Sequence, residues 1–154
     1  MVQVQDLFTI LGGRIIHQNV NFEIKKEKTT VIIGRSGCGK SVLLKILLRL
    51  LNPYSGQILF EGQDIAFLPE KDLSEIRLKM GMVFQGAALF DSLNIYENVG
   101  FALKRIKKMP QEEAYQKVDE LLEWVGLKGK GNLYPSEMSG GMRKRAGIAR
   151  AIAI

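Results

Sequence analysis

The first third of the chain carries short patterns of apolar and polar residues that predict β-strands. VQVQDLF (2–8) alternates loosely between the two kinds of residue, and VNFEI (20–24) alternates more strictly. TTVIIG (29–34) is a β-branched run that ends in glycine, and QILFEG (57–62) is a shorter apolar run with the same ending. We expect a strand at each of these places, and a further short strand at GMVFQ (81–85).

Helical spacing of apolar residues dominates the rest of the chain. A helix is predicted for 41–51, apolar on most sides and therefore buried, and a polar helix for 69–80. From about Ile95 the pattern stays helical, and PQEEAYQKVDELLEWVG (110–126) is its clearest helix, with a proline that can open it and a glycine that can close it. The apolar residues of this helix fall on one face: Ala114, Val118, Leu121, Leu122 and Val125.

The change from strands to helices predicts two parts, 1–85 and 86–154, with the boundary at Gln85–Gly86. The length of 154 residues suits one domain or most of one. A net charge of +6 favours an anionic partner, which is a nucleic acid, a nucleotide or an acidic membrane surface. The single cysteine, Cys38, excludes an internal disulfide and favours a reducing compartment. The start lacks a secretory signal, and the most apolar run is too short to span a bilayer, so we expect a soluble chain.

GRSGCGKS (34–41) matches the phosphate-binding pattern G-x-x-x-x-G-K-[ST], between a predicted strand and a predicted helix. Its glycines let backbone N–H groups converge on phosphate oxygens, Lys40 can reach the β- and γ-phosphates, and the Ser41 hydroxyl can hold Mg²⁺. The predicted nucleotide-binding residues are Gly34, Arg35, Ser36, Gly37, Cys38, Gly39, Lys40 and Ser41. The alternative is a glycine turn followed by a chance lysine, and Cys38 is either a small filler or a redox group.

MSGGMRKR (138–145) places cations at the start of a predicted helix, where they oppose the helix dipole. A phosphate at that end would reverse the balance, whereas the alternative is a solvated basic face or a patch toward anionic lipid. The stretch resembles the signature motif of ATP-binding cassette (ABC) ATPases. The resemblance implies that Ser139, Gly140 and Gly141 open a helix facing the γ-phosphate of ATP bound by a second subunit.

MGMVFQGAALFDSLNIYENVGFAL (80–103) resembles the Q-loop region of the same family. The resemblance implies that Gln85 helps to hold Mg²⁺ and the attacking water, so Gln85 joins Lys40 as a catalytic candidate and Ser41 as a metal ligand. It also implies that the segment after Gln85 touches a membrane permease.

Two longer stretches, VFQGAALFDSLNIYENV and PSEMSGGMRKRAGIARAIA, look most like the ATPases of MCE-type lipid transporters, of which the Mla phospholipid transporter is an example. The implied fold is α/β, a P-loop NTPase with an amino-terminal β-rich subdomain, a partial parallel core and a helical subdomain. ATP and Mg²⁺ are the implied cofactors, and transport of phospholipid is the implied function. The implied partners are a second cassette subunit across ATP, an integral membrane permease and an MCE-type lipid-binding protein. The implied location is peripheral, on the cytoplasmic face of the inner membrane or on a plastid or other organelle membrane.

The chain departs from the family after the signature helix, where the family carries a strand ending in Asp-Glu and a switch histidine. Neither is present, since Glu61 is interpreted as a hairpin turn residue and His17 as structural. We therefore expect a truncated cassette that hydrolyses ATP poorly by itself and exposes the apolar edge of 29–34. Leu11 stands where the family usually stacks an aromatic ring on adenine, which predicts weaker binding of the base.

Two other functions remain open. One is a regulatory module that binds nucleotide without hydrolysis, favoured by the missing acidic strand. The other is a soluble cassette of DNA repair or translation, which the basic charge suits. The chain has no inserted coiled coil, and its basic residues do not alternate with aromatic ones, so no nucleic-acid partner is expected.

Overall fold

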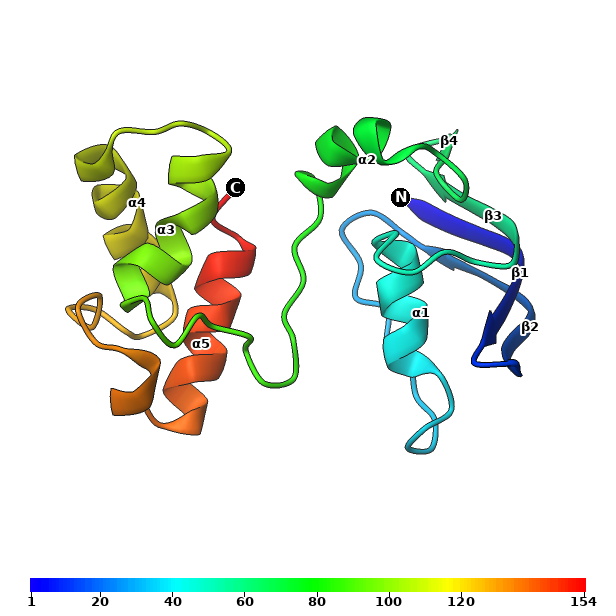
Figure 1. The fold of residues 1–154 in the computed structure, drawn as a ribbon, viewed down its shortest axis with the longest axis horizontal. Coiled ribbons are helices and arrows are strands. Elements are labelled where there is room, and N and C mark those ends of the chain that lie inside the picture. The colour runs from blue at the N-terminus through cyan, green and yellow to red at the C-terminus, as the bar shows by residue number, and fades with distance from the viewer. The chain divides into compact units, whose positions relative to one another are not determined.

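Four strands form one antiparallel sheet in the amino-terminal half of the structure, a computed structural model that describes residues 1–154 (Figure 1). The strand order is β2-β1-β3-β4, with β1 Val2–Leu11, β2 Arg14–Ile24, β3 Ser55–Phe60 and β4 Gln63–Asp64. Gly12 and Gly13 join β1 to β2, and both have positive φ angles, of 58° and 75°. Such a two-residue turn matches the twist of a hairpin.

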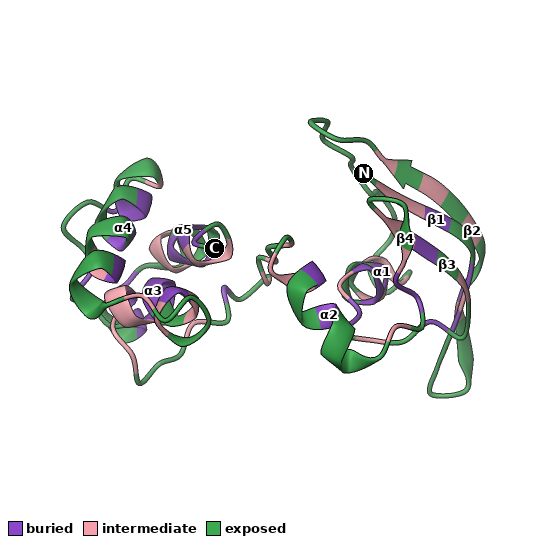
Figure 2. Cartoon of the chain, turned by 90° about the horizontal axis from the view of Figure 1, so that it is seen from above, coloured by how far each residue is buried: buried purple, intermediate pink, exposed green.

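Helix α1 (Lys40–Leu47) lies along one face of this sheet, and α2 (Glu70–Arg77) follows β4 (Figures 1 and 2). The buried side chains include Val4, Leu7 and Ile58 from the strands and Ile46 from α1. Helix α1 ends earlier than the predicted 41–51, because the chain turns at Arg49, whose φ angle is 53°. The Arg77 guanidinium donates to the carbonyl oxygens of Leu48 and Arg49, at 3.2 and 2.6 Å.

Two of the predicted strands, 29–34 and 81–85, are not strands in the structure. A strand needs a partner for its backbone hydrogen bonds, and neither segment pairs with another part of the chain. The apolar side chains of the first segment therefore lie in the open, with Val31 71% and Ile33 89% exposed. The apolar exposure expected at 29–34 is therefore confirmed, whereas the expected strand is absent.

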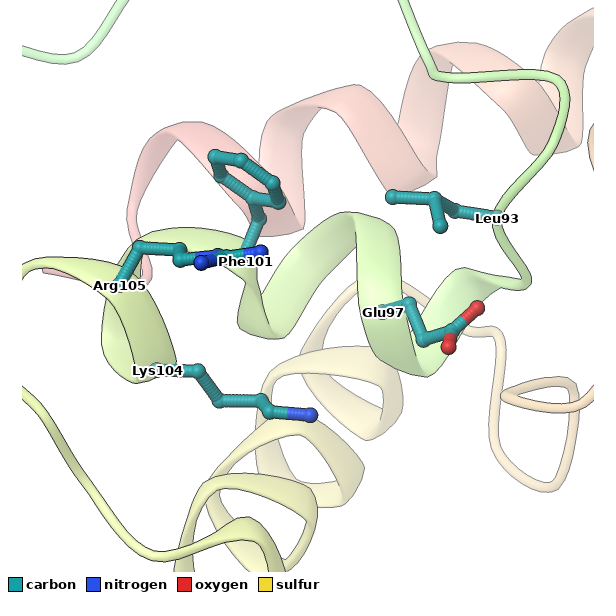
Figure 3. Close-up of a pocket in the computed structure, with 5 residues that line it drawn as sticks. All are labelled: Leu93, Glu97, Phe101, Lys104 and Arg105. Carbon is teal, nitrogen blue, oxygen red and sulfur yellow. The ribbon is translucent and has the colours of Figure 1, made fainter.

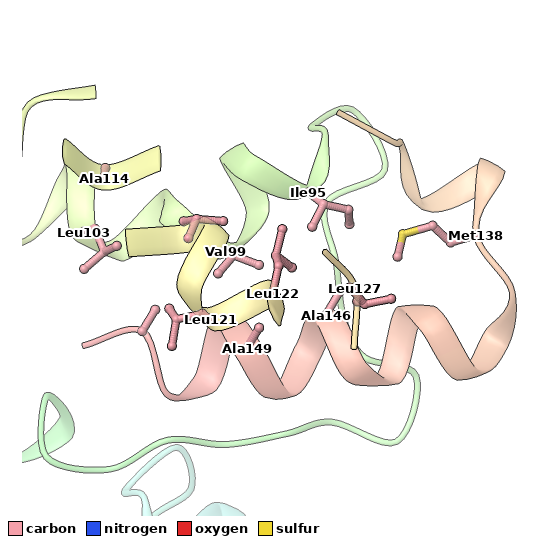
Figure 4. Close-up of a cluster of buried hydrophobic side chains, with 12 residues drawn as sticks. Ile95, Val99, Leu103, Ala114, Leu121, Leu122, Leu127, Met138, Ala146 and Ala149 are labelled. Atoms are coloured by element: carbon pink, nitrogen blue, oxygen red, sulfur yellow. The ribbon is translucent and has the colours of Figure 1, made fainter. Parts of the chain in front are cut away.

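The carboxy-terminal half is helical, as predicted. Its elements are α3 (Ile95–Arg105), α4 (Gln111–Trp124), a short 3₁₀ turn (Pro135–Glu137) and α5 (Gly140–Ala151). The predicted face of α4 enters the core, and the helix closes at Gly126, whose N–H donates to Glu123 while the Leu127 N–H donates to Leu122. The core is drawn in Figure 4 and consists of Ile95, Val99, Leu103, Ala114, Val118, Leu121, Leu122, Leu127, Met138, Ala146, Ala149 and Ala153.

The chain divides into two compact units, Met1–Arg77 and Leu78–Ile154. The division comes before the predicted boundary at 85–86. The reason is that Gly81 packs tightly against the backbone of Ala151 at the end of α5, so the residues after α2 belong with the helices.

Candidate functional site

The phosphate-loop residues 34–41 form one curled loop that leads into α1. The Lys40 Nζ amine folds back and donates to the carbonyl oxygens of Gly34 and Arg35, both at 2.8 Å. Gly37 and Gly39 have φ angles of 78° and 100°, which other residues rarely adopt. The expectation that Gly34, Gly37 and Gly39 take conformations closed to most side chains is therefore confirmed for Gly37 and Gly39, but Gly34 has no positive φ angle.

Position 34 needs a glycine because there is no room for a side chain, and not because of its φ angle. A Cβ atom there would lie 2.6 Å from the Cys38 sulfur, so the loop closes on itself at this point. At Gly37 an added Cβ would meet nothing within 4 Å, so the outer side of the loop is open. The loop residues that remain, Arg35, Ser36 and the exposed Cys38, lie on this open turn.

The loop fits a phosphate group electrostatically. Helix α1 begins at Lys40 with no acidic residue in its first turn, and its first N–H groups have no side-chain cap. An uncapped helix start carries a partial positive charge and attracts anions. The exposed Ser41 hydroxyl stands in the same first turn. The residues present therefore suit a nucleotide phosphate, and the Ser41 hydroxyl offers one ligand to a Mg²⁺ bound with it.

His17 of β2 packs against the phosphate loop. The sequence indicated this histidine only as structural and did not identify its contact. A Cβ atom on Gly39 would lie 2.8 Å from His17 Nε2, so ring and loop are in close contact. His17 is 8% exposed, and its Nδ1 atom has no hydrogen-bond partner. The hydroxyl of Thr9, opposite it in the β1–β2 pairing, has none either. Burial lowers the pKa of His17, and the Gly39 backbone opposes this in part.

The predicted signature residues open α5. Ser139 is the N-cap of this helix, and its hydroxyl accepts a hydrogen bond from the Met142 N–H at 3.2 Å. Gly140 and Gly141 form the exposed first turn, which contains no acidic residue. The helix start is thus built as the sequence predicted, with small residues and free N–H groups.

The three cations after Gly141 differ in their surroundings. The Arg143 guanidinium turns back and donates to the carbonyl oxygens of Met138 and Pro135. Arg143 therefore stabilises the turn before the helix in addition to carrying a positive charge at the start of the helix. Only Lys144 and Arg145 remain as exposed cations near this end.

Gln85 lies exposed in a tight turn, which is closed by a hydrogen bond of 2.9 Å from the Ala87 N–H to the Phe84 carbonyl. It belongs to the carboxy-terminal unit together with Ser139, whereas the phosphate loop belongs to the amino-terminal unit. The predicted Mg²⁺ ligands, Ser41 and Gln85, are therefore divided between the units. No cluster of three or more His, Cys, Asp or Glu side chains suited to a metal is present.

A groove of about 340 Å³ runs along α3 in the carboxy-terminal unit (Figure 3). Its apolar lining comes from Leu93 and Phe101, and its charged lining from Glu97, Lys104 and Arg105. The exposed Phe101 ring packs on Phe90, with 5.3 Å between the ring centroids. The groove therefore combines an aromatic surface with charges of both signs.

Asn98 organises the loop beside this groove, a role that the sequence motifs do not indicate. Its side chain is fully buried, and Oδ1 accepts from the Phe90 N–H at 2.7 Å. Its Nδ2 group donates to the carbonyl oxygens of Phe90, Leu93 and Asn94, at 3.0, 2.8 and 3.0 Å. An asparagine at an otherwise apolar helix position is the only signal that could have shown it.

Leu11, at the expected adenine position, is exposed at the end of β1 beside the hairpin turn. Phe8 does not replace the missing aromatic ring, because it packs edge-on against Tyr54, with 5.7 Å between centroids. No helix of the chain has the length and apolar content needed to cross a bilayer.

Comparison with known proteins gives matches along nearly the whole chain. The profile of the ABC transporter family matches residues 17–154. The intermembrane phospholipid transport system ATP-binding protein MlaF of Haemophilus influenzae is 45% identical over 154 residues, which are 100% of this chain and 58% of that protein. The methionine import ATP-binding protein MetN of Corynebacterium jeikeium is 46% identical over 144 residues, which are 92% of this chain and 39% of that protein.

A solved dimeric structure of an ATP-binding cassette in a post-hydrolysis state, bound to ADP and phosphate, has the same fold. It superposes with a TM-score of 0.89 at 33% identity, and the match covers 99% of this chain and 69% of that chain. This chain therefore spans 58% of the MlaF relative and 69% of the solved cassette.

Proposed function

The chain belongs to the ABC transporter family, and from that premise we propose that it is the ATP-binding part of a transporter that uses ATP to move phospholipid between membranes. Its fold is that of an ABC nucleotide-binding domain, present in part. The observation that carries the proposal is the phosphate loop, in which the Lys40 amine is held 2.8 Å from two loop carbonyls beside an uncapped helix start.

Nucleotide binding follows from atoms of the chain itself. The N–H groups of the loop and of the first turn of α1 bind phosphate oxygens. The Lys40 amine, now donating to the carbonyls of Gly34 and Arg35, would instead bind the β- and γ-phosphates, and the Ser41 hydroxyl would hold the metal. Mg²⁺, when bound, neutralises charge on the phosphate oxygens.

In this proposal the carboxy-terminal unit binds a nucleotide that is held by a second cassette subunit. The helix start at Ser139, Gly140 and Gly141 binds the γ-phosphate of ATP on the loop of a second cassette subunit. Its free N–H groups and lack of acidic residues support that role. Gln85 would supply an amide oxygen to a bound Mg²⁺ and a hydrogen-bond partner to the attacking water.

Phospholipid as the cargo rests on the overall similarity to MlaF, which extends over all 154 residues. The MetN relative, which is 46% identical, matches 92% of this chain and is a methionine import protein. The permease partner fits the groove along α3, where Leu93 and Phe101 suit the apolar face of a short helix and the flanking charges suit its polar face. An MCE-type lipid-binding protein is the third partner, and the complex lies on the cytoplasmic face of its membrane.

The test uses the complete gene product, purified with the proteins encoded beside it and reconstituted in vesicles that contain a labelled phospholipid. We expect ATP-dependent movement of the lipid, and a loss of ATP hydrolysis of roughly 100-fold in Lys40→Ala, because the phosphate charge loses its main counterion. Lys45→Ala, on an exposed position of the same helix, is the matched control and should keep full activity.

Three results would contradict parts of this proposal. Stimulation of ATP hydrolysis by methionine but not by phospholipid would contradict phospholipid as the transported substrate. Binding of ATP without hydrolysis by the complete product would favour the regulatory module instead. Equal activity of Lys40→Ala and the unaltered protein would overturn the phosphate site.

A further inference from the structure

The turn that presents Gln85 is followed by backbone in an unusual conformation. Ala87 and Ala88 both have positive φ angles, of 63° and 50°. Residues other than glycine seldom adopt such angles, and two in succession cost free energy unless neighbouring groups hold them. Something in the fold must therefore fix this segment.

Arg150, in the last turn of α5, is the group that holds it. Its guanidinium donates from Nη2 to the Ala87 carbonyl at 2.8 Å and from Nη1 to the Ala88 carbonyl at 2.6 Å. The two bonds reach across 63 and 62 residues of sequence. A planar guanidinium makes such a forked pair, whereas a lysine ammonium has no matching geometry.

Gly147, one turn before Arg150, brings the helix against the same segment. A Cβ atom on Gly147 would lie 3.2 Å from the Ala87 Cβ and 3.4 Å from the Ala87 carbonyl oxygen. Ala87 itself is only 1% exposed. The segment is therefore fixed by packing on one side and by two hydrogen bonds on the other, and both come from α5.

We propose that Arg150 is a positioning residue that fastens the Gln85 turn to α5, so that Gln85 and the helix start at Ser139 move as one piece. Helix α5 runs unbroken between the Ser139 cap and the turn that contains Arg150. A nucleotide that binds at the Ser139 end of the helix and shifts the helix would then also shift the Gln85 turn at the other end. The proposal rests on the proposed function and assigns Arg150 a task within it.

The first test asks whether the attachment exists and needs no ATP hydrolysis. Amide hydrogen exchange at residues 86–88 is measured in the nucleotide-free complete gene product. Arg150→Gln should speed exchange at these amides at least about tenfold, while the amides of α4 keep their protection. Lys117→Gln, an exposed position on α4, is the control and should change nothing at 86–88. Unchanged exchange in Arg150→Gln would overturn the proposal.

The second test asks whether Arg150 acts through Gln85. Arg150→Lys and Arg150→Gln are compared in the normal background and in Gln85→Ala, with ATP affinity measured beside kcat. We expect kcat to fall about tenfold in the normal background and less than about twofold in Gln85→Ala, with ATP affinity unchanged. A merely structural role would lower kcat equally in both backgrounds, and that result would overturn the proposal.

The two tests separate this inference from the proposed function. If the unaltered protein fails to hydrolyse ATP while Arg150→Gln still loosens 86–88, the proposed function and the transmission to Gln85 both fall, and only the attachment stands.

Discussion

One residue packed against the phosphate loop, His17, makes the stability of the folded chain depend on pH. The pKa of His17 is lowered by burial, so the folded chain binds a proton less readily than the unfolded chain. Stability is therefore full above the ordinary histidine pKa of about 6.5 and falls as the pH drops below it. His17→Leu should remove this loss, because a leucine fills the apolar site without a proton to bind.

The measurement is the melting temperature between about pH 7.5 and about pH 5.5, with Gln18→Leu, an exposed neighbour on β2, as control. The control should keep the acid sensitivity of the unaltered chain. A similar fall in His17→Leu and the unaltered chain would show that other groups cause it.

Leu11, at the expected adenine position, is a second single residue that should affect function, in this case the affinity for ATP. Leu11 is exposed and offers no ring to the base. Leu11→Tyr should tighten ATP binding about two- to tenfold, since stacking contributes about 0.5–1.5 kcal/mol beyond burial. Titration with ATP and GTP measures the effect and any gain in preference. Thr30→Tyr, exposed elsewhere in the same unit, should leave both affinities as they are.

For single residues, the sequence best predicts features whose interacting groups lie close together along the chain. The spacing from Gly34 to Ser41 indicated a loop with unusual glycines, and the structure shows positive φ angles at two of them. The partners of Asn98 lie within eight residues, but its burial depends on the packing of the whole unit. The carbonyls that bind Arg150 are about sixty residues away, so no local pattern contains them.

At the scale of elements, the junction of α1 and α2 depends on arginines that bind backbone carbonyls. Arg77 donates to Leu48 and Arg49 at the end of α1, and the buried Arg49 donates to Ile65 at 2.7 Å. Arg77→Ala should lower the free energy of unfolding by about 1–3 kcal/mol, because the two carbonyls lose their donor. Chemical denaturation measures this, with Lys71→Ala on the exposed side of α2 as control. An effect no larger than that of the control would contradict it.

The loop between Gln85 and α3 depends in the same way on Asn98. Asn98→Ala should destabilise the carboxy-terminal unit by roughly 1–3 kcal/mol, since the Phe90 N–H and the Leu93 carbonyl lose their partner. The carbonyls of Phe90 and Asn94 lose one bond each but keep a backbone N–H donor. The substitution should also weaken capture of the permease, because Leu93 lines the groove and its carbonyl is one of those released. Denaturation and co-purification are the measurements, and Asn132→Ala, on an exposed loop, should affect neither.

Helices were easier to predict than strands for a physical reason. Helix α4 satisfies its own backbone, and its apolar face, proline start and glycine end all lie within its own sequence. A strand is completed only by another strand. The segments 29–34 and 81–85 have strand-like composition but no neighbouring strand to pair with. Composition alone therefore predicted two strands that do not form.

At the scale of the whole molecule, the exposed segment 29–34 opposes the solubility that the net charge of +6 provides. Val31 and Ile33 expose their apolar side chains on a segment whose backbone pairs with no strand, and such a segment can pair with other chains. The 154-residue chain should therefore self-associate, and added salt should increase this by screening the repulsion between like-charged molecules. Val31→Lys together with Ile33→Lys should reduce association, as measured by light scattering against concentration. Ile10→Lys with Ile15→Lys adds the same charge at exposed positions of the β1–β2 hairpin. If that pair reduces association equally, charge and not the edge is responsible.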